Sequence, residues 1–309
     1  MSSQITTAFV KQYSAEVFHL SQQQGSRLAP LVRNESQKGE SAFYDRIGAT
    51  TAILKASRHA DTPQIDTPHS RRRVTLKDYV WADLIDKEDL RRMLMDPAGD
   101  YAKAAAWAMG RAKDDVIIAA ADGDAYGGVD GGTVVVHPNS QKLAAVSGGA
   151  FVDMNVGLLR GVKKIFDSND VDESIPRHAA ITSSQLESLL STTEVTSADY
   201  NTVRTLVMGE IDTFLGFKFI RTERLLTQVD ALSADPTTGI VGTGSSIVGQ
   251  RRCIFWAQDG LLLATAEDIM TEIERRPDKN YSTQVYVSMG IGATRMEEEK
   301  VVIGFCKEA

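Results

Sequence analysis

The sequence predicts an α+β fold, in which helices and strands are mixed without the regular alternation of parallel α/β proteins. Three observations predict it. The clearest helical pattern covers residues 97–121, the chain ends in two β-prone runs, STQVYVSMGIGATR and KVVIGFC, and polar glycine-rich stretches interrupt what lies between. The 309 residues are 42% hydrophobic and 24% charged, which is enough to bury a sizeable core.

The first segment, residues 1–45, is predicted to be an extended arm. An apolar stripe at helical spacing runs through residues 5–20 and consists of Ile5, Phe9, Tyr13, Val17 and Leu20. The polar stretch at 21–41 has no sustained period and contains Gly25, Pro30 and Gly39. Because no compact domain is predicted beside this arm, we expect the stripe to pack on another subunit.

Residues 46–90 are predicted to form a long β-hairpin. From Gly48, GATTAILKASR is β-prone, HADTPQIDTPHS supplies turn residues, and RRRVTLKDYVWADLI resumes the β pattern. An isolated two-stranded hairpin is marginally stable in water, so we expect this one to pack against something outside itself.

Two charge clusters flank the second half of this hairpin. The basic cluster is Arg71, Arg72 and Arg73, and the acidic cluster is Asp86, Glu88 and Asp89. We interpret each cluster as part of a solvent-exposed face. If the hairpin crosses to a neighbouring subunit, however, clusters of opposite sign would orient the contact.

The predicted helix at 97–121 has clear end signals. Asp96 is a suitable N-cap, Pro97 occupies the first position, Asp100 complements the helix dipole and Gly123 offers a stop. A helix of this length is a rod of roughly 37 Å. One side carries Tyr101, Ala105, Ala108, Ala112 and Val116. The small alanines allow other backbone to approach closely.

The remaining chain alternates irregularly between element types. A glycine-rich loop at 123–132 precedes a short β run at 133–137. Helices are predicted around 152–167, after Ser183 or Ser184 as a cap, and at 196–211, with a strand between the first two. GFKFIRTERL reads as a strand, 227–250 as a loop, and RRCIFWAQDGLLLAT as β structure.

Two glycine-rich loops resemble ligand-binding motifs without completing them. Asp122, Asp124 and Gly127 match the first, third and sixth positions of a calcium loop, but Thr133 stands where a bidentate Glu is required. The string VGTGSSIVG at 241–249 lacks the G-K-[ST] of a phosphate loop. We therefore expect a flexible turn and a mobile surface loop, respectively.

No catalytic, cofactor-binding or metal-binding residue is predicted. The histidines are scattered without a metal or nucleophile motif: His19, His59, His69, His137 and His178. Cys253 and Cys306 have no disulfide or zinc spacing, which favours folding in a reducing cytosol. The net charge of −7 argues against a surface that grips nucleic acid throughout. No secretory signal and no apolar run near the roughly 20 residues of a membrane span are present, so we expect a soluble protein.

The carboxyl-terminal third, WAQDGLLLATAEDIMTEIERRPDKNYSTQVYVSMGIGATRMEEEKVVIGFCKE, resembles the end of a family of tailed-phage major capsid proteins. The resemblance extends to the arm, FVKQYSAEVFHLSQQQGSRLAPLV, and to GEIDTFLGFKFIRTERL, and it is least distinctive at 121–150 and 227–250. It implies the Hong Kong 97-type fold. In that scheme residues 1–45 are the N-terminal arm, 46–90 the E-loop hairpin, 91–125 and 266–309 the peripheral domain with the spine helix at 97–121, and 126–265 the axial domain.

The resemblance also implies a function. The chain would assemble into hexamers and pentamers of an icosahedral shell around double-stranded DNA, in the virion and after folding in the bacterial cytoplasm. Its implied partners are further copies, portal, scaffold and possibly decoration proteins, and DNA contacted non-specifically at the inner surface. A scaffold could be separate or already cleaved. Lys55 is a formal candidate for a covalent cross-link, but an ordinary exposed lysine is the simpler reading.

Two alternatives stay open at this point. An encapsulin-like compartment shares the implied fold but packages an enzyme cargo instead of a genome. A nucleotide-binding enzyme would use the loop at 241–249, although the sequence offers no further sign of catalysis.

Overall fold

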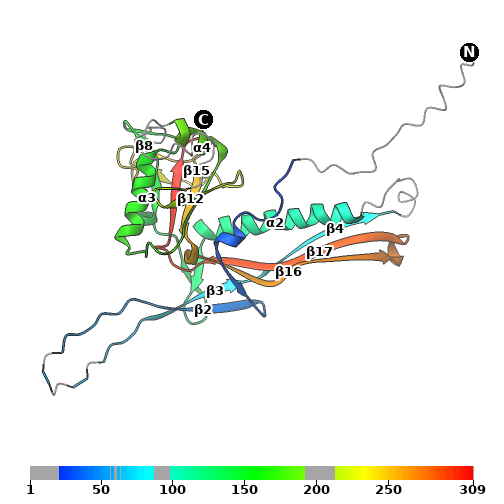
Figure 1. The fold of residues 1–309 in the computed structure, drawn as a ribbon, viewed down its shortest axis with the longest axis horizontal. Helices are drawn as coiled ribbons and strands as arrows, with labels where there is room; N and C mark the ends of the chain where they lie inside the picture. Colours follow the sequence, from blue (N-terminus) through cyan, green and yellow to red (C-terminus); the bar gives the residue numbers. More distant parts are fainter. Residues whose placement is uncertain are drawn as a thin grey trace, which may run out of the picture.

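The computed structural model of the protein describes residues 21–55, 57–58, 61–62, 64–86, 98–191 and 213–308. A compact part lies at one end, a long flat layer extends from it, and a loop projects away from both (Figure 1). The predicted stripe at 5–20, the predicted helix at 196–211, and Asp96, Pro97, Glu88 and Asp89 lie outside the described residues.

The flat layer consists of one long helix on one four-stranded sheet. The helix α2 (Ala98–Asp122) runs along a sheet with strand order β1-β16-β17-β4 (Figure 1). Its strands are β1 (Arg33–Ser36), β16 (Leu261–Arg276), β17 (Ser282–Arg295) and β4 (Lys77–Ile85). Strands β16 and β17 form a long antiparallel hairpin, β4 pairs antiparallel with β17, and β1 is parallel to β16.

The predicted long helix is confirmed, but its buried side differs from the predicted one. The fully buried apolar residues are Ala105, Met109, Ile117, Ile118 and Ala121. Of the predicted stripe only Ala105 is among them, while Tyr101, Ala112 and Val116 are partly buried against the core. The reason is that the sheet covers one side of α2 and the segment before β1 covers part of another, so that no single stripe describes its burial.

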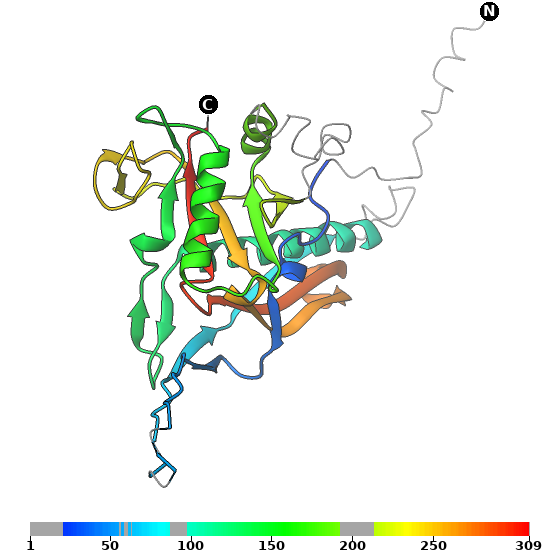
Figure 2. The same cartoon turned by 60° about the vertical axis from the view of Figure 1, so that its left-hand side comes forward.

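The compact part is a six-stranded sheet with strand order β11-β12-β10-β15-β18-β7. The strands are β11 (Thr213–Phe214), β12 (Phe217–Arg221), β10 (Arg177–Ile181), β15 (Arg251–Ala257), β18 (Val301–Cys306) and β7 (Lys142–Ala144). The helices α3 (Val156–Ser168) and α4 (Ser183–Ser191) pack on it (Figure 2). Every residue of β10 and β18 is buried, as expected for strands covered on both faces.

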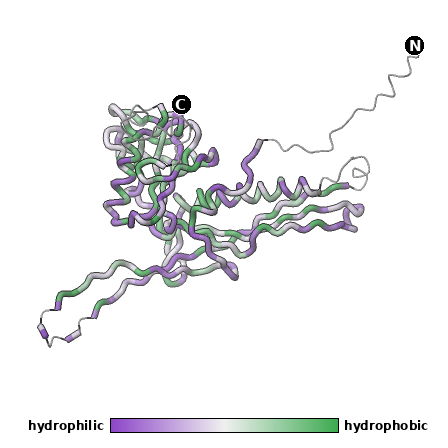
Figure 3. The backbone as a smooth tube through the Cα atoms, in the orientation of Figure 1, coloured by the Kyte–Doolittle hydropathy of each residue, from purple (hydrophilic) through white to green (hydrophobic). Residues whose placement is uncertain are grey.

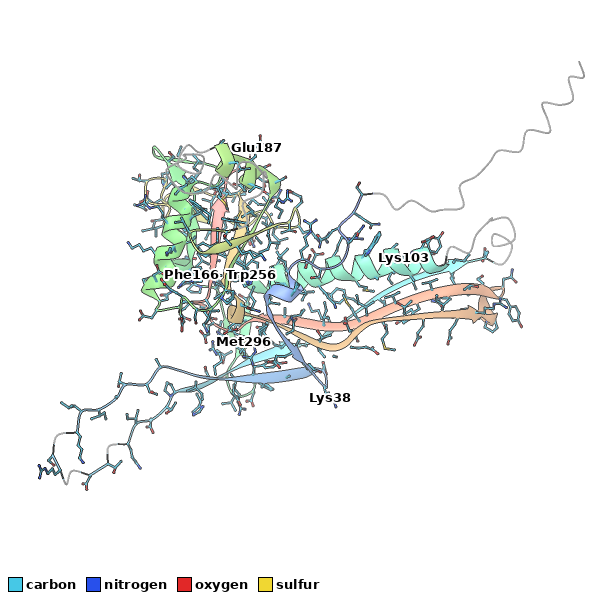
Figure 4. The ribbon with its side chains drawn as sticks, viewed as in Figure 1. Lys38, Lys103, Phe166, Glu187, Trp256 and Met296 are labelled. Atoms are coloured by element: carbon cyan, nitrogen blue, oxygen red, sulfur yellow. The ribbon has the colours of Figure 1, made fainter. Side chains whose placement is uncertain are left out.

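The compact part and the flat layer share one hydrophobic core. Phe166 of α3 contacts Phe217 with ring centroids 5.8 Å apart, and Phe217 contacts Phe255 at 5.6 Å. The same cluster continues to Met109 of α2 and Met289 of β17. Phe166 and Trp256 both lie inside the compact part in Figure 4. The two parts therefore fold as one body.

A third sheet, with strand order β2-β3-β5-β6, lies at the base of the projecting loop. It consists of β2 (Ser41–Ile47), β3 (His69–Thr75), β5 (Ala125–Gly127) and β6 (Thr133–Val135). The remaining short strands pair as β8 (Val146–Ser147) with β9 (Ala150–Phe151) and β13 (Ser233–Ala234) with β14 (Ser245–Ser246). Single 3-10 turns are η2 (Ala29–Leu31), η3 (Asn139–Gln141), η5 (Gln258–Gly260) and η6 (Pro277–Lys279).

The predicted hairpin at 46–90 needs correction. Its second half is divided between β3, which pairs with β2, and β4, which pairs with β17 in the long sheet. Its first half, from Gly48, contains no strand among the described residues up to 58. A β-prone segment becomes a strand only where a partner strand is available, and residues 48–55 have none in their own chain.

The predicted arm at 1–45 is not extended away from its own chain throughout: its stripe at 5–20 lies outside the described residues, but residues 28–36 pack on the body. Leu28 and Val32 are buried in the main core, and β1 joins the long sheet through Arg33 to Ser36. One smaller prediction also shifts by a residue. The helix α4 begins at Ser183, so Thr182 occupies the cap position, and its carbonyl accepts the first helical bond from Leu186.

Candidate assembly surfaces

The described part of residues 48–68 projects from the body as a loop (Figures 1 and 3). The Gly48 amide donates to the Pro68 carbonyl at 2.8 Å and closes its base. Apolar side chains are exposed along it, among them Leu54, which is 92% exposed, Ile53 and Ile65. Exposed apolar groups on a projecting loop favour association with another surface.

The sheet at the base of this loop presents a surface that we call the basic face. It consists of Phe43, Ile47, Arg71, Arg73, Tyr126 and Val134. Phe43, Arg73, Tyr126 and Val134 stand opposite one another in a row across β2, β3, β5 and β6. The Arg73 guanidinium lies 5.2 Å from the centre of the Tyr126 ring, a cation–π arrangement that keeps the charge outside.

A hollow borders the basic face where β3 approaches the β5–β6 turn. Its volume is about 460 Å³, and its lining includes Asp45, His69, Arg71 and Val129. Val129 is exposed, and Arg71 is held by an ion pair with Asp45 at 2.8 Å. The hollow and the basic face together form a continuous apolar and basic surface.

The long sheet presents a surface of opposite charge on the side away from α2, which we call the acidic face. It consists of Val80, Leu84, Met270, Glu272, Glu274 and Tyr286. Register places these residues in rows, Glu272 beside Tyr286 and Glu274 in line with Leu84. The intervening Val285, Val287 and Met289 are buried, which fixes the exposed residues on the other side of the sheet.

Among the described residues, the outer edge of β16 has no pairing strand over much of its length. Strand β1 pairs only with Leu262 to Thr265, so that within the described chain no strand pairs on that side from Glu267 to Arg276. Two register irregularities, after Thr265 and after Glu267, bend the open stretch. Bulges and charges of this kind protect a sheet edge from uncontrolled pairing.

The structure separates the three arginines that the sequence places together. Arg72 is 2% exposed and donates to Glu298 and to the Met296 carbonyl, while Arg71 and Arg73 point outward. Met296 lies where the long sheet meets the sheet of β2, β3, β5 and β6 (Figure 4). The interpretation of all three as one solvated cluster is therefore wrong for Arg72. Of the acidic cluster, Asp86 accepts a hydrogen bond from Ser282 at 2.7 Å.

Asp122, the first residue of the candidate calcium loop, is occupied by cationic partners. Its carboxylate lies 3.0 Å from the Lys142 ammonium and 2.8 Å from the Arg252 guanidinium, with His137 at 3.6 Å. Burial tends to raise the pKa of Asp122. The His137 contact and the two cations together lower it by more, so that the pKa lies well below its usual range. Among the described residues, no cluster of three or more acidic, histidine or cysteine side chains is arranged to hold a metal.

The loop at 241–249 is anchored instead of cradling a phosphate. The amides of Gly242, Ile247 and Gly249 donate to carbonyls of Ser233, Leu232 and Gln228. Val241 and Ile247 are buried. Since a phosphate loop needs free amides directed at the ligand, this geometry does not support nucleotide binding, and the predicted mobile surface loop is in part a fixed element.

Other sequence candidates take structural places. His137 and His178 are buried, His69 is exposed beside the hollow, and His19 and His59 lie outside the described residues. Cys253 and Cys306 are free and buried. Lys55 is exposed on the projecting loop. No helix of the described chain is long and apolar enough to cross a membrane.

Comparisons with known proteins identify the family and the fold of this chain. A family model described as phage capsid protein matches residues 5–308. A comparison with curated proteins gives no match. The capsid structure of cyanophage P-SCSP1u has a TM-score of 0.73 at 14% identity and covers 100% of this chain and 96% of its own.

Two further solved structures have the same fold. The capsid of Ralstonia phage GP4 has a TM-score of 0.71 at 8% identity, covering 97% of this chain and 96% of its own. The capsid of a native GTA particle has a TM-score of 0.68 at 12% identity, covering 99% and 97%. Identities this low establish a shared fold, which is the predicted one.

Proposed function

Because the chain belongs to the phage capsid protein family and is a major capsid protein of a tailed phage, we propose that its copies hold one another by overlap. In this proposal the loop at 48–68 and the basic face of one copy cover the acidic face of the next. The observation that carries the proposal is the loop itself, which extends apolar side chains away from the main core of the described chain.

Charge supports the pairing of the two faces. The basic face carries Arg71 and Arg73, and the acidic face carries Glu272 and Glu274, each among exposed apolar residues. Both are flat outer faces of sheets, a shape that packs well face to face. Within one molecule the two faces belong to different sheets and do not meet. Opposite charge would set the register of the contact, and apolar burial would stabilise it.

The elements of the structure suggest an assignment to the parts of the shell-building scheme. We propose that residues 1–45 are the arm, that the projecting loop is the E-loop within 46–90, that α2 is the spine helix of a peripheral domain formed by 91–125 and 266–309, and that 126–265 is the axial domain. Hexamers and pentamers would follow from head-to-tail contacts of one surface with a different one, since such contacts close into rings. Many simultaneous contacts then make the closed shell far more stable than any pair.

The role is structural, and the shell is part of the virion. Assembly in the host cytoplasm, contacts with portal, scaffold and decoration proteins, and non-specific contact with packaged DNA are proposals that the family assignment supports. The compartment alternative is not favoured, because the matching family describes phage capsid proteins.

The test removes the loop without disturbing its base. Residues 49–67 are replaced by Asn-Gly, a two-residue hairpin turn, since Gly48 and Pro68 are already hydrogen-bonded. We expect a folded protein with an unchanged melting temperature that forms no closed shells in negative-stain images.

A point variant provides the matched control. Ile53→Asp with Leu54→Asp should abolish shells, whereas Thr50→Asp with Thr51→Asp, which adds the same charge to the same loop, should reduce shell yield much less. Closed shells of normal size from the loop deletion would refute the overlap.

A further inference from the structure

The segment before β1 is held on the spine helix by a small and specific set of contacts. We call residues 22–32 the strap. Apart from the single turn η2, it forms no helix or strand, and it lies beside α2 (Figure 2). Because the strap has no helical or strand hydrogen bonds of its own beyond η2, its position depends on the side chains and backbone groups that it contacts.

One buried carboxylate receives most of the strap. Asp114, in the middle of α2, is 0% exposed. It accepts hydrogen bonds from the Leu28 amide at 3.0 Å and the Arg27 amide at 3.1 Å, and from the side chains of Gln23 and Ser26. All of these donors belong to the strap. A charged acceptor with several donors makes stronger bonds than a neutral one.

A glycine one helical turn earlier allows the strap to come this close. A Cβ at Gly110 would lie 2.5 Å from the carbonyl carbon of Gly25 and 2.8 Å from the Ser26 amide nitrogen. Gly25 itself has φ of 76°, a conformation that favours glycine. Because Gly110 and Asp114 are four residues apart, they lie on the same side of α2 and form one site.

Secondary contacts continue the attachment at both ends of the strap. Arg111 donates to the Gln22 side chain at 3.0 Å and to the Gln23 carbonyl at 3.1 Å. At the other end the Trp256 indole donates to the Leu31 carbonyl at 3.0 Å. The attachment therefore extends from α2 to the compact part, with Asp114 at its centre.

We infer that Gly110 and Asp114 form a docking site for the strap that determines where residues 1–20 join the body, and that shell assembly depends on this site. The inference rests on the proposed function. A tether that contacts a neighbouring copy is effective only when its attachment point lies within reach of its target. Asp114 is thus a positioning residue, because its carboxylate acts through the strap.

Two variants test the site by independent routes. Asp114→Asn removes the charge and replaces one of the two accepting oxygens by an NH2 group, which would face the donors of the strap. Gly110→Ala places a methyl group against the Gly25 backbone, while alanine is the better helix former, so α2 itself does not weaken. Each has a matched control on the same helix. Asp115→Asn loses an exposed ion pair with Arg224, and Gly99→Ala adds a methyl group where no atom lies within 4 Å.

The readouts are tryptic cleavage after Arg27 in the unassembled protein, the melting temperature, and the yield of closed shells. For both site variants we expect cleavage at least about tenfold faster, because cleavage follows the population of the open form. Because Leu28 and Val32 of the strap are part of the main core, the melting temperatures of both variants should fall by several degrees while the proteins stay folded, and their shell yields should fall at least about tenfold. Both controls should behave like the wild type.

Each other result decides against the inference or against its premise. Unchanged cleavage in both variants means that the site does not hold the strap, and fast cleavage with normal shells means that assembly does not depend on it. Unfolding of both variants means that the strap is inseparable from the core, which also overturns the inference. Wild-type protein that forms no shells would instead contradict the proposed function.

Discussion

Neighbouring residues of a strand point to opposite sides of its sheet, and Arg71, Arg72 and Arg73 show what this does to a run of equal charges. Arg71 and Arg73 reach solvent on the basic face. Arg72 enters the junction of two sheets, where burial lowers its pKa and the Glu298 charge raises it again. The alternation could be read from the sequence. The identity of the inner partner, 226 residues away, could not.

Substitutions at these positions should therefore differ in their effect on folding. Arg72→Ala removes the hydrogen-bonded buried partner of Glu298, which keeps only longer contacts with Arg295 at 3.6 Å and Arg46 at 3.8 Å, and we expect the free energy of unfolding to fall by about 3 kcal/mol. Arg71→Ala removes an exposed pair with Asp45 and should cost less than about 1 kcal/mol. Urea denaturation of the unassembled protein measures both, and equal losses would contradict the assignment of Arg72 to the interior.

Among the elements, the stretch from β3 to β4 shows how one β-prone segment can serve two sheets. The chain passes from β3 to β4 through Leu76 alone, whose amide donates to the Glu40 carbonyl at 2.9 Å. Strand β3 pairs with β2, which lies nearby in sequence, and β4 pairs with β17, about 200 residues later. Propensity predicts both strands, but only the distant partner decides where the first sheet stops.

The two charged faces on these elements lead to a charge-exchange prediction. Arg71→Glu with Arg73→Glu should abolish closed shells, as should Glu272→Lys with Glu274→Lys, because each places like charges opposite one another. The variant with all four changes should recover a substantial share of the shells seen by electron microscopy.

Charge controls separate this pairing from a general effect of net charge. Glu173 and Glu187 are both exposed, and Glu187 lies in the outer region of the compact part (Figure 4). The variant Glu173→Lys with Glu187→Lys changes the net charge as much as the acidic-face variant and should assemble normally. If the four-change variant assembles no better than the two double variants, the two faces do not meet.

At the scale of the whole molecule, buried polar groups join the flat layer to the compact part. Asp122 at the end of α2 meets Lys142 of β7 and Arg252 of β15. Arg295 of β17 donates to the carbonyls of Ala121 and Gly123, at 3.0 and 2.8 Å, and so satisfies the end of the helix. The junction thus holds the two parts in one orientation.

The buried histidines make global stability depend on pH. Burial lowers the pKa of His137 and of His178 from the usual 6.5, and the Lys218 charge lowers that of His178 further. Below about pH 6.5 the unfolded chain therefore binds more protons than the folded one. The free energy of unfolding consequently decreases as the pH decreases. We expect a loss between pH 7.5 and 5.5, of at most about 1.4 kcal/mol per pH unit for each histidine.

A variant isolates the contribution of one ring. His178 lies 5.5 Å from the Trp256 ring, a position that phenylalanine can fill, so His178→Phe should flatten the dependence. His69→Phe, at an exposed histidine, should leave it unchanged. A slope that His178→Phe does not alter would contradict the assignment of the titration to this residue.

Local features of the sequence determined several elements by themselves. Alanine-rich helical periodicity predicted α2, the alternating runs at the end predicted β17 and β18, and the strings near Trp256 indicated the family. These signals depend on neighbours in the chain, so they are legible without the fold. They also predicted that the segment at 46–90 would pack against something outside itself.

The tertiary structure alone decided which residues meet. It placed the strap on Asp114, divided the arginine cluster, left residues 48–55 without a strand partner and arranged two faces of opposite charge. Such outcomes depend on contacts between residues 80 to 230 positions apart, whose partners local patterns do not specify. Burial and pairing are properties of the assembled core, and for that reason only the folded chain distinguishes an inward charge from an outward one.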